Sequence, residues 1–234
     1  MPNREWIVGS HQPIAKHEDN LWSVTAPLFD GFVKRMTLMR LRDGRVVVHS
    51  AIPLDDASMR EIEAWGPIAF IVAPNALHDL DVDPYARRYP DAKVLCSVKS
   101  RKKFEKIARV DGTFEDLPGG QGIGVAILDG TKTDEPVFLV DSDGRTSLVF
   151  TDAIFNTAHS GGFKGTLFRW IGSTGGPRVT ALFRLTAVKD RKALHAHLAR
   201  LLATPTLARV IMSHGAIVES DLHGFTRTVL ASIP

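Results

Sequence analysis

The stretch AFIVAPNALHD, residues Ala69 to Asp79, is an apolar run that stops abruptly at a histidine and an aspartate. Three further runs end in the same way: GRVVVHS at Gly44 to Ser50, SLVFTD at Ser147 to Asp152, and ARVIMSHG at Ala208 to Gly215. Short β-branched runs bounded by turn residues are typical of buried strands in an α/β sheet. Because ligands of such sheets bind outside the strand ends, the four runs predict one polar site, assembled from distant parts of the chain.

Composition favours an ordinary folded protein. The chain has 234 residues, 44% of them hydrophobic, and a formal charge of +3 from 29 basic and 26 acidic residues. Cys96 is the only cysteine, which excludes an intramolecular disulfide and favours a reducing compartment, with the thiol packed in an apolar stretch. The N-terminus has no apolar signal segment, and no run approaches the length of a membrane span. We therefore predict a cytoplasmic protein that does not bind membranes.

The chain shows neither low-complexity tracts nor long linkers, which predicts a single domain over residues 1–234. Asp-Gly pairs at 43–44 and 143–144 predict two hairpins, each leading into a strand that ends on a candidate site residue. This internal similarity favours a fold of two similar halves.

Helices are expected between the strands. Asp55 is predicted to cap a helix that Gly66 ends in a left-handed conformation. Asp83 with Pro84 predicts the start of a short helix, and Ser100 a cap for the helix that follows it. A fourth helix is expected to begin near Asp190, with an apolar face of Leu194, Leu198, Leu201 and Leu202. The alternation of strands and helices indicates an α/β layered protein.

Residues 156–180, NTAHSGGFKGTLFRWIGSTGGPRVT, combine many glycines with bulky apolar side chains. Long glycine-flanked loops of this kind often cover a site as a lid. A short packed helix with flexible ends is the other interpretation, and loop statistics do not decide between the two.

Several spaced strings resemble the metallo-β-lactamase superfamily. They are DNLW at 19–22, RMTLMRL at 35–41, DGRVVVHSAIPL at 43–54, the pair Gly66-Pro67, and VAPNALHD at 72–79. The resemblance spans nearly the whole chain and implies an α/β fold, the αββα sandwich of two similar halves with a metal site along one edge. More narrowly, the strings are similar to a bacterial branch known as a domain of unknown function.

The metal motif differs from the superfamily's pattern. Its usual first motif is His-x-His-x-Asp-His, and the matching stretch reads PNALHD at 74–79, with proline and alanine at the first two histidine positions. The closing Asp-His pair is reversed as His78-Asp79. The next ligand region, LDGTKTDEP, has no histidine, and Thr131 is the nearest residue. By this resemblance, Asp152 matches the aspartate that bridges two metals, and His214 matches the last histidine ligand.

The resemblance therefore implies half of a dinuclear site. His78, Asp152 and His214 are the expected ligands of one divalent ion, which would be zinc, manganese or iron, with Asp79 as a ligand or general base. His49, Asn75 and His159 are expected around them. Such an ion lowers the pKa of a water molecule, as hydrolysis requires.

Two functions remain open at this point. The first is a mononuclear metal-dependent hydrolase of a small ester, amide, thioester or phosphoester. The second is a catalytically inactive relative, with no ion at all, that binds a small molecule or a protein partner in the same cleft. Each candidate residue also has a structural interpretation: His214 as a strand end, and Asp152 as a helix cap.

Nucleic-acid binding is a minor alternative. It would rest on the basic run from Lys99 to Arg109, which alternates with Phe104 and Ile107 and is better explained as a solvated helix face. Nothing in the sequence indicates the substrate or the oligomeric state.

Overall fold

The protein is represented by a computed structural model that describes residues 5–29, 32–75, 78, 81–159, 166, 169–170 and 172–233. The chain divides into two compact units, one of Met1–Ala26 and Arg35–Val125, the other of Pro27–Lys34 and Ala126–Pro234. The single domain expected from the sequence stays a prediction. Within the described ranges no helix has the length and apolar character needed to cross a membrane.

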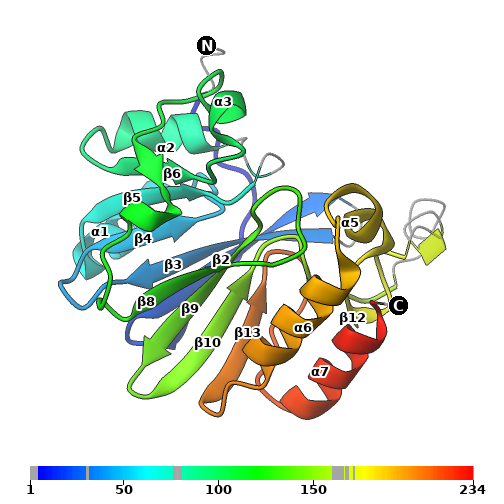
Figure 1. The fold of residues 1–234 in the computed structure, drawn as a ribbon. Coiled ribbons are helices and arrows are strands. Elements are labelled where there is room, and N and C mark those ends of the chain that lie inside the picture. Colours follow the sequence, from blue (N-terminus) through cyan, green and yellow to red (C-terminus); the bar gives the residue numbers. More distant parts are fainter. Residues whose placement is uncertain are drawn as a thin grey trace. The chain divides into compact units, whose positions relative to one another are not determined.

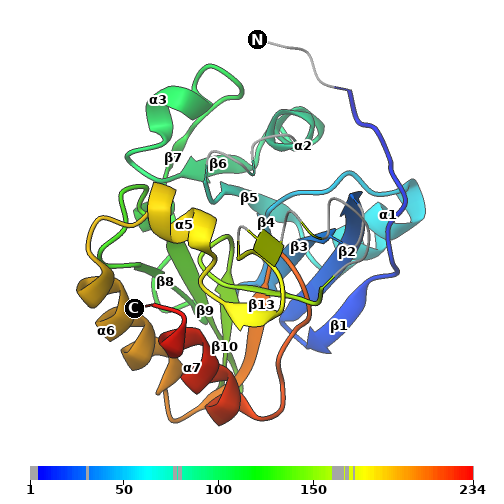
Figure 2. The same cartoon turned by 90° about the vertical axis from the view of Figure 1, so that its right-hand side faces the viewer.

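A seven-stranded sheet forms the centre of the first unit, in the order β1-β2-β3-β4-β5-β6-β7 (Figure 2). The β3 and β4 strands pair antiparallel across the Asp43-Gly44 turn, as predicted, and β4 to β7 run parallel. The bounds are β1 Ala15–Glu18, β2 Leu21–Phe29, β3 Phe32–Arg40, β4 Val46–His49, β5 Ile68–Ala73, β6 Lys93–Cys96 and β7 Gly112–Thr113.

Helices of the first unit bury their apolar faces in its core. They are α1 Asp56–Trp65, α2 Val82–Arg88, α3 Arg101–Phe104 and the short 3₁₀ helix Phe114–Asp116. Met59 and Ile62 of α1 and Tyr85 of α2 belong to one buried cluster with the strand residues Val48 and Ile71. An amphipathic helix that packs on a sheet is stabilised because its apolar face is removed from water.

Gly66 ends α1 as predicted, but for a different reason. Its φ of 171° is extended backbone, not the left-handed conformation expected. A Cβ atom at Gly66 would lie 2.2 Å from the carbonyl oxygen of Gly44. Close approach of two backbone segments therefore excludes a side chain here.

The helix start predicted at Asp83 was wrong, whereas the Asp55 cap is confirmed. The α2 helix begins before Asp83, at Val82, and Asp81 occupies the cap position. Ser100 occupies the N-cap position of α3 as predicted, but it has a helical conformation and its side chain makes no capping hydrogen bond. Adjacent polar residues offer competing caps, which a sequence pattern does not separate. The Cys96 thiol is buried as expected, and burial raises its pKa to about 11.

A four-stranded sheet in the order β13-β10-β9-β8 is the centre of the second unit (Figure 1). The predicted hairpin at Asp143-Gly144 joins β9 to β10 in antiparallel pairing, whereas β10 and β13 run parallel. The bounds are β8 Ile123–Ile127, β9 Pro136–Ser142, β10 Arg145–Phe150 and β13 Leu207–Met212. A separate hairpin consists of β11 Phe155–Thr157 and β12 Gly176–Arg178.

Helices α6 and α7 lie next to each other on this four-stranded sheet (Figures 1 and 2). The helices of the unit are α5 Ala181–Thr186, α6 Arg191–Leu202 and α7 Leu222–Ala231. The predicted α6 is confirmed: the Asp190 side chain accepts a hydrogen bond from the Ala193 N–H group, and the four leucines named above are buried. Leu194 and Leu198 share a core cluster with Phe150 and Val210 of the sheet.

Most of the residues that would distinguish a lid from a packed helix lie outside the described part of the chain. Thr166, Arg169 and Trp170 are helical, and the Trp170 side chain is 86% exposed. Residues 160–165, 167–168 and 171 lie outside the described part of the chain. Both interpretations therefore stay predictions.

Candidate metal centre

Asp152 and His214 are brought together by the parallel pairing of β10 and β13. Phe150 and Met212 are register partners at the ends of these strands, and the Ser213 N–H group donates to the Phe150 carbonyl oxygen over 3.0 Å. Each candidate residue follows its strand by two positions. The Nε2 atom of His214 lies 3.2 Å from Oδ1 of Asp152, and both side chains are about nine-tenths buried.

The other ring nitrogen of His214 has a fixed role. Nδ1 lies 2.8 Å from the carbonyl oxygen of Val33, in the hairpin segment that belongs to the same unit. A carbonyl only accepts hydrogen bonds, so Nδ1 carries the proton and donates it. In the neutral ring Nε2 then presents a lone pair, and this lone pair faces a carboxylate oxygen of Asp152.

Nε2 of His214 and Oδ1 of Asp152 lie 3.2 Å apart in a buried position. An imidazole nitrogen and a carboxylate oxygen are both common ligands of divalent zinc, manganese and iron. Histidine ligands of metals commonly donate their other N–H group to a backbone carbonyl, as His214 does to Val33. The donor set therefore fits a divalent cation.

Glu135 fixes the backbone on the carboxylate side of the pair. Its side chain is only 1% exposed, and its Oε1 atom accepts a hydrogen bond of 2.9 Å from the Asp152 N–H group. Glu135 could not be predicted from the sequence, because a single Glu-Pro pair before a strand has no distinctive pattern. On the other side of the pair, the Phe155 ring lies 4.7 Å from the His214 ring, centroid to centroid, which restricts rotation of the imidazole.

Gly215 positions the turn that follows His214. Its φ is 104°, and a Cβ atom there would lie 2.0 Å from the carbonyl oxygen of Asn156 on β11. The Asn156 N–H group donates to the His214 carbonyl oxygen over 3.1 Å. The turn is thus held against β11, which keeps the imidazole in place.

The remaining ligand and neighbour candidates of the first unit also lie at strand ends. His49 is the last residue of β4 and is fully buried, and Asn75 and His78 follow β5 and are 7% and 6% exposed. The strands are parallel neighbours, with His49 opposite Val72, so these residues leave the sheet at the same edge. The His78 N–H group donates to the Asn75 carbonyl oxygen over 3.1 Å.

Ser50, directly after His49, has a φ of 55°. This left-handed conformation is uncommon for residues other than glycine, and such backbone is concentrated at functional sites. Asp79 lies outside the described residues. His159 of the second unit is exposed, and its Nδ1 atom lies 3.0 Å from the Thr174 hydroxyl oxygen.

Comparison with known proteins identifies the fold. No family model and no curated protein matches the chain. Solved metallo-β-lactamases do match. DIM-1 has 13% sequence identity and a TM-score of 0.64, and the match covers 97% of this chain and 100% of that one. The enzyme from Pontibacter korlensis has 16% identity and a TM-score of 0.60, with 93% of this chain and 98% of that one covered, and the enzyme from Hirschia baltica has 14% identity and a TM-score of 0.60, with 94% and 98% of the two chains covered. The chain therefore has the predicted α/β fold of the metallo-β-lactamases. At these identities the likeness shows the fold alone.

Proposed function

We propose that the chain is a metal-dependent hydrolase with a mononuclear site, acting on a small ester, amide, thioester or phosphoester. The observation that carries the proposal is His214, whose two ring nitrogens both face acceptors, one of them the Asp152 carboxylate. In this proposal Asp152 and His214 hold one zinc, manganese or iron ion together with His78, the third ligand expected from the sequence. A divalent ion at such a site supplies Lewis acidity and activates water for hydrolysis.

The residues of the chain have defined tasks in this proposal. Val33 and Phe155 fix the tautomer and the orientation of the His214 ring, and Glu135 fixes the backbone of Asp152. Asp79 is proposed as a further ligand or as the general base that takes a proton from water. His49, Asn75 and His159 are proposed as supporting residues around the ligands.

We further propose that the chain belongs to the bacterial branch of the superfamily that its sequence resembles, with the altered metal motif described above. Its location is proposed to be cytoplasmic, and its ligand a small molecule. Neither a nucleic acid nor a membrane is proposed as a partner.

The second candidate function is an inactive relative that binds a ligand without an ion. Pro74 and Ala76 favour it, because they occupy positions at which the superfamily has histidines. The loss of those ligands removes the dinuclear activation of water.

Elemental analysis separates the two functions. Protein purified without added metal is expected to contain about one zinc, manganese or iron ion per chain. The ion is expected to be lost in His214→Ala, Asp152→Asn and His78→Ala and retained in His195→Ala, which changes an exposed histidine on α6. An ion-free wild-type chain that also binds none of the three ions on dialysis would favour the inactive relative. Hydrolysis of nitrophenyl esters and phosphoesters by the loaded protein then tests the activity.

A further inference from the structure

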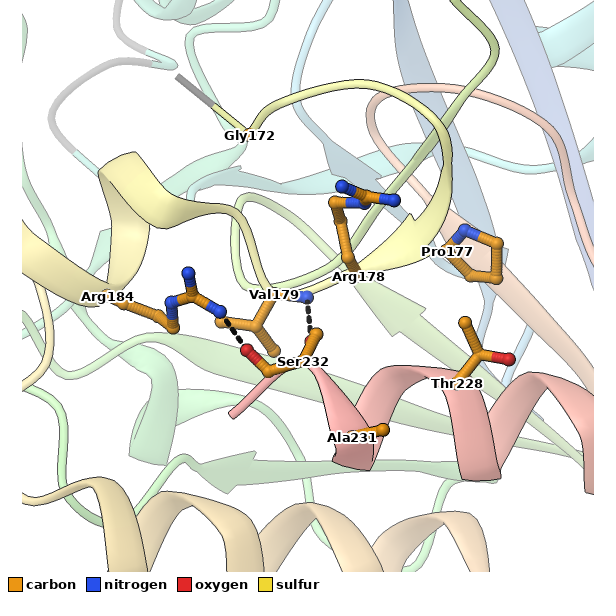
Figure 3. Close-up of a pocket in the computed structure, with 8 residues that line it drawn as sticks. All are labelled: Gly172, Pro177, Arg178, Val179, Arg184, Thr228, Ala231 and Ser232. Carbon is orange, nitrogen blue, oxygen red and sulfur yellow. Dashed lines mark hydrogen bonds between the residues drawn. The ribbon is translucent and has the colours of Figure 1, made fainter. Parts of the chain in front are cut away.

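A cavity of about 310 Å³ opens in the second unit between the end of β12, helix α5 and the C-terminal end of α7 (Figure 3). Two guanidinium groups line it, from Arg178 and Arg184, together with apolar surface from Pro177, Val179 and Ala231. None of these residues belongs to the proposed metal centre.

Both arginines are held by backbone carbonyl groups. Nη1 of Arg184 donates to the carbonyl oxygen of Ser232, at the end of α7, and Nη2 of Arg178 donates to the carbonyl oxygen of Gly175 over 2.6 Å. The Nε atom of Arg178 is buried and has no acceptor among the described residues. These contacts fix the two side chains in place without neutralising them.

The positive charge at the cavity has no counter-charge in the described part of the second unit, where neither guanidinium pairs with a carboxylate. Burial, with repulsion from Arg191 and Arg178, lowers the pKa of Arg184. Arg191 thus adds a third positive charge close enough to act on Arg184. A bound anion would offset this repulsion.

We propose that this cavity binds the phosphate group of a small molecule, with Arg178 and Arg184 as the phosphate-binding residues. Two guanidinium groups match the charge of a phosphate dianion, and their planar donor forks suit its oxygen atoms. The apolar part of the wall would contact the rest of the molecule, and the volume is that of a small-molecule pocket. The sequence contains no signal for this site, because Arg178 lies in the glycine-rich stretch 156–180 and Arg184 is an isolated arginine after it.

The first test is titration calorimetry with inorganic phosphate and with phenyl phosphate, against sodium chloride of equal ionic strength. Both phosphates are expected to bind and chloride is not. Arg178→Gln and Arg184→Gln are expected to weaken binding about tenfold, the loss of one charge-assisted hydrogen bond. Arg200→Gln removes the same formal charge from α6, where Arg200 pairs with Asp129, and is expected to bind as the wild type does.

The results distinguish a phosphate ester from free phosphate as the ligand, and this cavity from the metal centre as the binding site. Tighter binding of phenyl phosphate identifies a phosphate ester as the natural ligand, and equal binding identifies free phosphate. Asp152→Asn is expected to retain phosphate binding, because no residue that lines the cavity is a proposed metal ligand. Loss of binding in Asp152→Asn, or equal weakening by Arg200→Gln, would overturn the proposal.

A second test needs no variant and so does not depend on how well a substituted chain folds. Phenylglyoxal modifies accessible arginines of the wild-type chain, and mass spectrometry of its peptides measures the extent at each position. Phosphate is expected to protect Arg178 and Arg184 at least severalfold and to leave Arg227, an exposed residue of α7, unchanged. Uniform modification with and without phosphate would contradict the site.

Discussion

At the scale of single residues, the pair of His214 and Asp152 is defined by its hydrogen-bonding requirements. The Val33 carbonyl group determines which nitrogen of His214 carries the proton, and the carboxylate then faces the remaining lone pair. If asparagine replaces Asp152, an amide NH₂ group takes the place of one carboxylate oxygen. This group can donate a hydrogen bond to Nε2 directly.

Asp152→Asn is therefore expected to lose the metal ion and yet to fold as stably as the metal-free wild type, or more so by about 1 kcal/mol. Urea unfolding of both proteins in the presence of a chelator measures the difference. Asp152→Ala is the matched control, since it removes the carboxylate without supplying a hydrogen-bond donor to Nε2. A metal-free Asp152→Asn protein that is less stable than the metal-free wild type would contradict this account of the pair.

At the scale of elements, the site was predictable where strands end. Runs such as SLVFTD and ARVIMSHG indicate both a buried strand and the polar residue behind it, and parallel pairing then brings Asp152 and His214 to one edge. Glu135, Val33 and Phe155 were not predictable, because each acts through a contact between elements distant in sequence. Helix boundaries at Asp81 and the close approach at Gly66 depend in the same way on tertiary packing.

Gly215 gives a test at this scale. Gly215→Ala is expected to lower the free energy of unfolding by about 3 kcal/mol or more and to displace His214, since it combines left-handed strain with a contact of 2.0 Å to Asn156. Gly176→Ala is the control: its φ is 91°, but a Cβ atom there meets nothing within 4 Å, so strain alone costs about 1 kcal/mol. Denaturant unfolding compares the two, and equal losses would exclude the contact as the cause.

The cap of α1 predicts a pH dependence. Hydrogen bonds from Ser58 and Ala57 lower the pKa of Asp55 from its usual 3.8 to about 2. A carboxyl group whose pKa is lowered by folding stabilises the protein above its unfolded pKa, and this contribution is lost as the pH falls through about 2. Serine also caps helices but does not titrate.

Relative to Asp55→Ser, the wild type is therefore expected to lose stability between pH 4 and pH 2. Urea midpoints of the two proteins at several pH values measure the difference. A difference that stays constant over this range would show that the carboxylate of Asp55 does not stabilise the folded chain.

At the scale of the whole molecule, the comparisons with solved structures show the fold, whereas the activity is argued from the site alone. The chain matches entire solved metallo-β-lactamases in fold at identities of 12–16%. A fold supports many activities, so function has to be argued from the site. The spaced strings from Asp19 to Asp79 were sufficient to predict the fold, whereas the altered motif PNALHD left the activity open between two functions.

Metal binding is expected to stabilise the whole chain. An ion present at about 100 times its dissociation constant contributes about 2.7 kcal/mol, which corresponds to a rise in Tm of about 5–10 °C for a chain of this size. Calorimetric scans of metal-free protein with and without the ion found by elemental analysis measure this shift. His195→Ala is expected to retain it, and His214→Ala is expected to show none.

The most direct test of the metal centre is an anomalous difference map of a crystal, with X-rays tuned just above the absorption edge of the ion that elemental analysis identifies. We predict one strong peak within coordinating distance of both Nε2 of His214 and Oδ1 of Asp152. A map without a peak there, in a crystal soaked with that ion, would contradict the metal centre, and the hydrolase proposal would be wrong.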